Sequence, residues 1–126
     1  MKYPISPGQT IRLPITVRSK GRVCELEAIL DTGASFVTIP RRAASFLGYD
    51  LRHAPRVKIN TANGVVRAPL ITLAKTGLGE LEETDVPAIC LNIEAGGVLS
   101  LLGMNLLGRF RVVIDPKKRL LSITRP

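Results

Sequence analysis

The chain has 126 residues, long enough to bury an apolar core without a metal or disulfide, so we expect residues 1–126 to form one domain. Hydrophobic residues make up 45% of it, with three Phe, two Tyr and no Trp, which excludes a disordered chain and predicts an aliphatic core of β-strands. The formal charge of +8 is spread along the chain without interleaved aromatic residues, so a solvated basic face is favoured over a nucleic-acid binding surface.

The cysteines and the apolar stretches set further limits. Cys24 and Cys90 have no partner at a metal-ligand spacing, so we expect reduced, buried thiols and no metal, with a single disulfide as the alternative. The longest apolar stretch, residues 98–107, is too short to span a bilayer, and residues 1–10 lack the apolar segment of a signal peptide. A cytoplasmic protein without a membrane segment is expected, with an anchor outside this chain as the alternative.

The first predicted elements are a hairpin, a short strand and a helix. Residues 11–18 and 23–30 alternate apolar and polar side chains on either side of the turn signal Ser-Lys-Gly at 19–21. Residues 36–39 form a short apolar strand, and the sequence RRAASFLG that follows Pro40 predicts a brief helix that a glycine ends.

The middle of the chain predicts two more hairpins. Residues 57–61 and 65–73 flank Ala-Asn-Gly at 62–64, and Asn-Gly is among the strongest signals for a tight hairpin turn. A second turn is predicted at 76–79, before a strand at 81–91.

The last third of the chain predicts short elements. An apolar run ends in Leu-Leu-Gly at 101–103, and a helical turn follows at 104–107. Strands are predicted at 110–114 and 120–124, joined by a turn at 116–118. The chain as a whole is therefore predicted to be mostly β, with one or two short helices and no internal linker.

One charged residue stands where the pattern predicts the end of a buried strand. The stretch AILDTGAS, residues 28–35, places Asp31 directly after three apolar residues. A carboxylate there is costly to desolvate unless it is hydrogen-bonded or neutralised. Asp31 is thus the candidate functional residue; the alternative is a structural role, since Asp, Thr and Gly are ordinary turn residues.

The order of these motifs resembles the retropepsin-like aspartic proteases, the single-domain relatives of the two-lobed pepsins. The resemblance covers residues 11–123 and rests on Asp-Thr-Gly-Ala-Ser after a strand, the Asn-Gly hairpin and the late Leu-Leu-Gly. It is closest to cellular and bacterial members, in which a Leu-Leu-Gly-Met-Asn segment and Arg-Phe-Arg also precede a strand that ends in Asp. The resemblance implies an all-β half-barrel with one or two short helices, and an aspartic endopeptidase that cleaves peptides or proteins without a metal or cofactor.

The resemblance implies that Asp31 is the catalytic acid and that Thr32, Gly33, Ala34 and Ser35 support its loop. Gly33 permits backbone angles and a close approach that a side chain would block. The Thr32 hydroxyl is expected to hydrogen-bond to a second copy of the loop, and the Ser35 hydroxyl to donate to the Asp31 carboxylate.

The resemblance also assigns a flap and a structural element. The flap is the hairpin tip that closes over an extended peptide and pairs with its backbone: Thr61, Ala62, Asn63, Gly64 and Val65. Viral members usually have a glycine-rich tip, so the Asn-Gly tip of this chain predicts a flap of different shape. Leu101-Leu102-Gly103 is expected to pack behind the catalytic loop.

An aspartic protease needs two carboxyl groups that share a proton, one acting as base on a water and the other as hydrogen-bond donor to the scissile carbonyl. The chain has one Asp-Thr-Gly, so the resemblance implies a two-fold homodimer in which both Asp31 side chains meet at the axis. Terminal strands often interleave at this interface. Here Pro4 and Pro7 disfavour a strand at the start, so residues 120–124 are the better candidate.

Other polar residues are expected to be structural, and the chain has one alternative function. Asp115 follows a strand, but Asp-Pro-Lys-Lys is typical of an exposed turn. His53 is expected to be a surface loop residue, and Arg109 and Arg111 to face one side of a strand, on the surface or near the dimer interface. The alternative function is a catalytically silent retropepsin-like module for dimerisation or binding.

Overall fold

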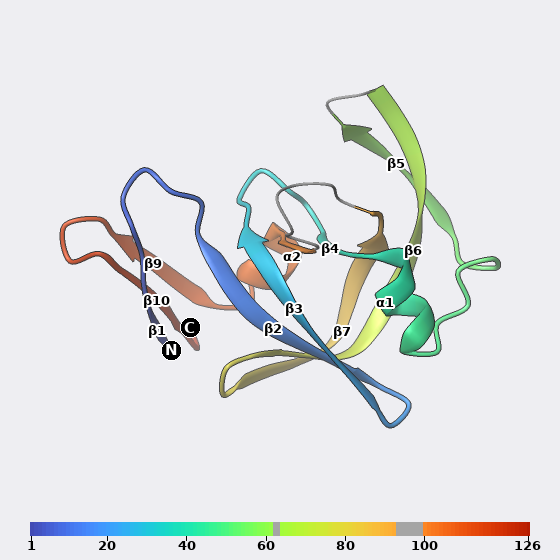
Figure 1. The fold of residues 1–126 in the computed structure, drawn as a ribbon, viewed down its shortest axis with the longest axis horizontal. Helices are drawn as coiled ribbons and strands as arrows, with labels where there is room; N and C mark the ends of the chain where they lie inside the picture. Colours follow the sequence, from blue (N-terminus) through green and yellow to red (C-terminus); the bar gives the residue numbers. More distant parts are fainter. Residues whose placement is uncertain (62–63, 93–99) are drawn as a thin grey trace.

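The computed structural model describes residues 1–61, 64–92 and 100–126, and within them the chain is mainly β-structure (Figure 1). Its strands are β1 (Lys2–Pro4), β2 (Arg12–Ser19), β3 (Arg22–Leu30), β4 (Val37–Ile39), β5 (Arg56–Thr61), β6 (Gly64–Leu78), β7 (Leu81–Cys90), β8 (Ser100–Leu102), β9 (Arg111–Asp115) and β10 (Leu120–Thr124). Its helices in these ranges are α1 (Arg41–Phe46) and α2 (Met104–Leu107), and neither is long and apolar enough to cross a membrane. The prediction of a mostly β chain with one or two short helices is confirmed.

The larger sheet curls back on itself. Its strands follow the order β2-β3-β8-β4-β7-β6-β5, and β2 also pairs with β6. The hairpin pairs β2–β3, β5–β6 and β6–β7 are antiparallel, whereas β3–β8 and β4–β7 are parallel. Because β6 closes the circle with β2, strand β5 is left at a free edge, and the β5–β6 hairpin projects from the body in Figure 1.

Apolar side chains at alternate positions fill the inside of this curled sheet. On β2, Leu13, Ile15 and Val17 are at most 1% exposed, while Pro14 between them is exposed and Thr16 is half-buried. Leu73 of β6 and Leu102 of β8 join the same cluster. The buried residues of the described ranges are largely aliphatic, as the composition predicts.

A second, three-stranded sheet of order β1-β10-β9 brings the two ends of the chain together. The expectation that proline disfavours a strand at the start is wrong for β1. The Ile5 N–H donates to the Arg119 carbonyl at 3.1 Å, and the Ile123 N–H donates to the Met1 carbonyl at 2.8 Å. Because hydrogen-bonded positions alternate along an antiparallel pair, Pro4 falls where its nitrogen points away from β10 and costs no ladder bond.

Strand β6 runs further than the sequence predicted. Leu78 pairs with Leu81, so the predicted turn at 76–79 shrinks to two residues, of which Gly79 has a positive φ of 59°. Gly77 stays within the strand, opposite Thr16 of β2. Glycine at 77 favours a turn in the sequence, but pairing with a neighbouring strand on both sides overrides that preference.

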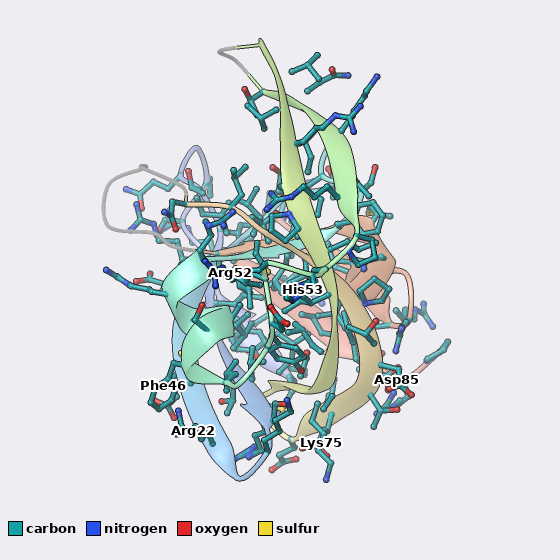
Figure 2. All side chains as sticks on the ribbon, turned by 90° about the vertical axis from the view of Figure 1, so that its right-hand side faces the viewer. Arg22, Phe46, Arg52, His53, Lys75 and Asp85 are labelled. Carbon is teal, nitrogen blue, oxygen red and sulfur yellow. The ribbon has the colours of Figure 1, made fainter. Side chains whose placement is uncertain are left out.

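The tip of the β2–β3 hairpin is held against helix α1 by two cations. Lys20 Nζ donates to the Gly48 carbonyl at 2.9 Å, and the Arg22 guanidinium donates to the Phe46 carbonyl at 2.8 Å. The guanidinium also lies 5.2 Å from the centre of the Phe46 ring, and Figure 2 shows the two side chains together. These contacts satisfy carbonyls that the end of the helix leaves without an intrahelical partner.

Arg109 was predicted to lie on a strand with Arg111, and this prediction is wrong. Arg109 lies in the turn between α2 and β9, while Arg111 begins β9 and is exposed. The Arg109 guanidinium donates to the carbonyls of Thr84 and Asp85 at 2.7 and 2.9 Å. It therefore joins this turn to β7, a tertiary contact that the local sequence pattern does not encode.

The roles predicted for Asp115 and His53 are structural, and the described contacts agree. The Asp115 carboxylate accepts a hydrogen bond from the Lys118 N–H at 3.1 Å, within the turn that follows β9. His53 is exposed, and its Nδ1 lies 2.7 Å from a carboxylate oxygen of Asp50. The hydrogen bond from His53 holds the pKa of Asp50 below its ordinary value.

Both cysteines are free, as predicted. Cys90 is buried, whereas Cys24 is half-buried and so more accessible than expected. Burial raises the pKa of the Cys24 thiol and raises that of Cys90 to about 11. Both thiols are therefore protonated at neutral pH, which makes them poor nucleophiles.

Candidate active site

Asp31 begins the loop that follows β3, where a neighbouring strand fixes its backbone. Strand β8 runs parallel to the end of β3, with Leu102 beside Leu30. The Asp31 N–H donates to the Leu102 carbonyl at 3.0 Å, which extends this pairing by one residue. Asp31 is half-buried, so the core holds its main chain while its carboxylate reaches the surface of a cleft.

The residues after Asp31 fold back around its carboxylate. The Gly33 N–H donates to Asp31 Oδ1 at 2.9 Å, and the Ala34 N–H donates to the Asp31 carbonyl at 3.2 Å. Thr32 and Ser35 are exposed. In the described residues the Asp31 carboxylate accepts its hydrogen bond from the main chain at Gly33, not from the Ser35 hydroxyl as expected.

The start of α2 holds the far side of this loop. The Met104 N–H donates to the Ala34 carbonyl at 2.8 Å, and the Asn105 N–H donates to the Ser35 carbonyl at 3.1 Å. Helical N–H groups at this end have no intrahelical acceptor, so they are free to bond the loop.

The side chain of Asn105 is a positioning element that the sequence analysis did not assign. Its Oδ1 accepts from the Val37 N–H at 2.9 Å, and its Nδ2 donates to the Pro87 carbonyl at 2.6 Å. The Asn105 amide therefore joins α2 to Val37 at the start of β4 and to Pro87 in the second half of β7. The sequence did hold a signal for this role: Asn105 is a lone polar residue in an apolar run, and a polar side chain needs hydrogen-bond partners when it is buried.

Gly103 lies at the start of α2, against the main chain of Phe36 in the loop. A Cβ at this position would lie 2.3 Å from the Phe36 carbonyl oxygen and 2.8 Å from the Phe36 nitrogen. Its φ of −88° is ordinary, so glycine is required here by the close approach of two main chains, not by backbone conformation. The structure thus places Leu102 and Gly103 against the Asp31 loop, while Leu101 lines the cleft.

A cleft of about 870 Å³ separates the Asp31 loop from the β5–β6 hairpin. Three groups of residues line it: the loop, the hairpin and the floor between them. The loop contributes Asp31, Gly33, Ala34, Ser35 and Phe36, and the hairpin contributes residues 57–61 and Val66. The floor consists of Thr38, Ile89, Leu91, Asn92 and Leu101. Asp31 is the one carboxylate in this described lining, and Lys58 is the one cation.

The hairpin tip is described only in part. Thr61 Oγ1 donates to the Gly64 carbonyl at 2.8 Å across the tip, and the Val65 side chain is 63% exposed. Ala62 and Asn63, also assigned to the flap, lie outside the described residues. The described part of the predicted flap therefore lies at the end of the hairpin that borders the cleft.

Nothing in the described ranges groups three or more His, Cys, Asp or Glu residues in a way that would hold a metal ion. The chemistry that this arrangement offers is that of a carboxylate beside a cleft lined by both apolar and polar side chains.

Comparison with known proteins decides the family. The family model described as "gag-polyprotein putative aspartyl protease" matches residues 15–109, three quarters of the chain. The chain belongs to this family of aspartyl protease domains. The retropepsin-like resemblance drawn from Asp-Thr-Gly and its neighbouring motifs is thereby confirmed.

Solved structures show how closely the fold agrees with the family. A retropepsin-like aspartic protease from Rickettsia conorii is 28% identical, with a TM-score of 0.74, over 98% of this chain and 88% of that chain. The retroviral protease-like domain of Ddi1 from Leishmania major is 20% identical, with a TM-score of 0.58, over 91% and 88% of the two chains. The second likeness shows the fold alone. No curated protein matches the chain.

Proposed function

We propose that the protein is an aspartic endopeptidase that acts as a homodimer, with Asp31 of each chain as the catalytic acid. The observation that carries this proposal is the position of the Asp31 carboxylate, which borders the cleft while main-chain hydrogen bonds fix its loop. Membership of the aspartyl protease family supports the same chemistry.

The chemistry requires a second carboxyl group, which the described cleft of one chain does not contain. Two carboxyl groups a few ångströms apart favour a state that shares one proton. The ionised carboxyl then takes a proton from water as the water attacks the scissile carbonyl, and the protonated carboxyl donates a hydrogen bond to the carbonyl oxygen. The carbon–nitrogen bond then breaks as the carboxyl that took the proton passes it to the leaving amine nitrogen. Two-fold symmetry supplies this pair from two copies of Asp31.

The cleft suits an extended peptide. Val57, Ile59 and Val66 of the hairpin, with Leu101 of the floor, offer apolar contacts to substrate side chains. In this proposal the edge strand β5 pairs with the peptide backbone as an added strand would. Closure of this flap would remove water from around the reacting carbonyl.

Asp31→Asn tests the assignment directly. The Asn side chain keeps an oxygen that accepts the Gly33 N–H, so the loop and the fold should be retained. Cleavage of a diverse peptide mixture should fall by about a thousandfold or more, because an amide cannot act as the base. Cleavage products are measured by mass spectrometry from about pH 4 to about pH 7, the range in which a carboxyl pair can hold one proton.

The control is the oligomeric state and circular dichroism of both proteins at the same concentration. Cuts made by the wild type alone support the proposal. Substantial cleavage by pure, folded Asp31→Asn contradicts it. No cleavage by either protein, with both folded and dimeric, favours the silent binding module.

A further inference from the structure

The segment that forms α1 and the flap hairpin is strongly basic. Residues 32–79 contain seven Lys or Arg residues and one carboxylate, Asp50. Asp50 contacts His53, and Lys75 lies 4.0 Å from Glu82. Across the described ranges, the other six cations of this segment form no ion pair within the chain. The excess of cations over carboxylates in residues 32–79 leaves positive charge available to bind a ligand.

Three of these cations lie together on the β5–β6 hairpin. Arg56, Lys58 and Arg67, here called the flap cations, are all exposed. Lys58 and Arg67 are direct partners in the ladder, and Arg56 lies two residues from Lys58 on the same face. Like charges directly opposite each other destabilise an antiparallel pair. An anion bound beside them would therefore relieve a repulsion that the free hairpin carries.

Protection of a free edge explains the charge of this cluster but not its position beside the cleft. Charged residues keep edge strands from pairing with other chains, and β5 is an edge strand. Both strands of the hairpin are edges here, because β6 pairs with β7 only from Leu70 onward, so edge protection accounts for Arg56, Lys58 and Arg67 alike. Lys58 also borders the cleft that contains Asp31. The cluster is thus continuous with the site where a substrate would lie.

We infer that the flap cations select peptides in which acidic side chains flank apolar residues at the scissile bond. Val57 and Ile59 offer apolar contacts inside the cleft, and Lys58 between them offers a cation at its border. Because successive side chains of a strand point to opposite faces, Lys58 lies on the opposite face of β5 from Val57 and Ile59, and a peptide added at the β5 edge meets the two kinds of contact with alternate side chains. This preference rests on the proposed function, and the homodimer would apply it on both sides of the bond.

A peptide fits these cations better than a nucleic acid does. Binding of single strands combines cations with aromatic side chains on which bases stack. Strands β5 and β6 contain no Phe, Tyr or Trp. The spacing of the flap cations instead matches an extended chain with an acidic residue at every second position.

Kinetics with a matched pair of peptides tests the inference. The peptides share an apolar centre and differ in having Glu or Gln on both sides of it. The wild type should cleave the Glu peptide with a KM about fivefold lower and a similar kcat, since the contact lies away from the reacting atoms. The difference should shrink as salt is added.

Two double variants locate the effect. Lys58→Gln with Arg67→Gln should abolish the preference for Glu. Lys117→Gln with Lys118→Gln removes the same charge from the turn between β9 and β10, away from the flap hairpin in Figure 1, and should leave the preference intact. Equal KM values for the two peptides in the wild type would overturn the inference, as would a preference that survives in the flap variant.

Binding to Asp31→Asn separates this inference from the proposed function. Fluorescence polarisation with the labelled peptides should show tighter binding of the Glu peptide without any cleavage. Tighter Glu binding by proteins that cut nothing would retain the peptide preference and contradict the protease. Efficient cleavage of the Glu and Gln peptides with equal KM values would support the protease and contradict the peptide preference. Labelled single-stranded DNA that binds more tightly than the Glu peptide, and depends on the same two cations, would assign them to nucleic acid instead.

Discussion

Gly103 positions the Asp31 loop by lacking a side chain. The Phe36 main chain occupies the space where a Cβ would lie, and the next two N–H groups of α2 bond the loop carbonyls of Ala34 and Ser35. A methyl group here must push the loop and the helix apart. At the residue scale, the position of Asp31 therefore depends on a close contact some seventy positions away in the sequence.

Gly103→Ala should lower the free energy of unfolding by about 1–3 kcal/mol, because overpacking forces the backbone to shift. It should also reduce peptide cleavage per folded molecule, since the shift displaces the Asp31 loop. Gly77→Ala is the matched control: its Cβ would lie no closer than 3.7 Å to other atoms. Denaturant titration and cleavage rates measure both effects, and a Gly103→Ala protein as stable and active as Gly77→Ala would refute this account.

Glu83 joins three parts of the chain: β7, the turn before β9 and the end of the chain after β10. Its carboxylate contacts Arg125, which follows β10, and lies 3.6 Å from Arg109, which precedes β9. Arg125 also stacks over the Phe110 ring at 5.2 Å. The hydrogen bond from Arg125 is the main reason that the pKa of Glu83 lies below its ordinary value near 4.5.

A carboxyl group whose pKa is lowered by folding stabilises the folded state above its unfolded pKa. This contribution is lost as pH falls through the folded pKa. Glu83→Gln should therefore lower the free energy of unfolding at pH 7 by about 0.5–1 kcal/mol, with the difference from wild type shrinking below about pH 4. Glu25→Gln, an exposed carboxylate, serves as control. Denaturant titrations at several pH values measure the difference in free energy of unfolding between Glu83→Gln and the wild type. A difference that grows as the pH falls would be inconsistent with this network.

Most strands and helices were predicted from the sequence because the residue patterns that specify them lie within the elements and their turns. Alternation and the turn residues predicted the β2–β3 and β5–β6 hairpins, and the short apolar strand and RRAASF predicted β4 and α1. Strand β1, the full length of β6 and the turn that contains Arg109 depend on contacts with distant segments. The Asp31 loop was found from its motif, whereas Asn105 was missed because its two partners, Val37 and Pro87, are adjacent only in the fold.

At the scale of the whole molecule, the account depends on assembly. One described cleft contains one carboxylate, so the proposed chemistry requires two chains at a single site. The likeness to the Rickettsia conorii protease shows that nearly the whole chain follows one retropepsin-like fold. That residues 1–126 form one domain, and that Thr32 bridges two copies, stay predictions.

The measurement that tests the central claim most directly is the activity of mixtures of wild type and Asp31→Asn at fixed total concentration. Subunits are allowed to exchange fully before peptide is added, and dimer content is checked in every mixture. If each site needs Asp31 from both chains, an equal mixture retains about a quarter of the wild-type rate, because only dimers of two wild-type chains are active. A rate of about half would show that each chain works alone, which would contradict the shared site.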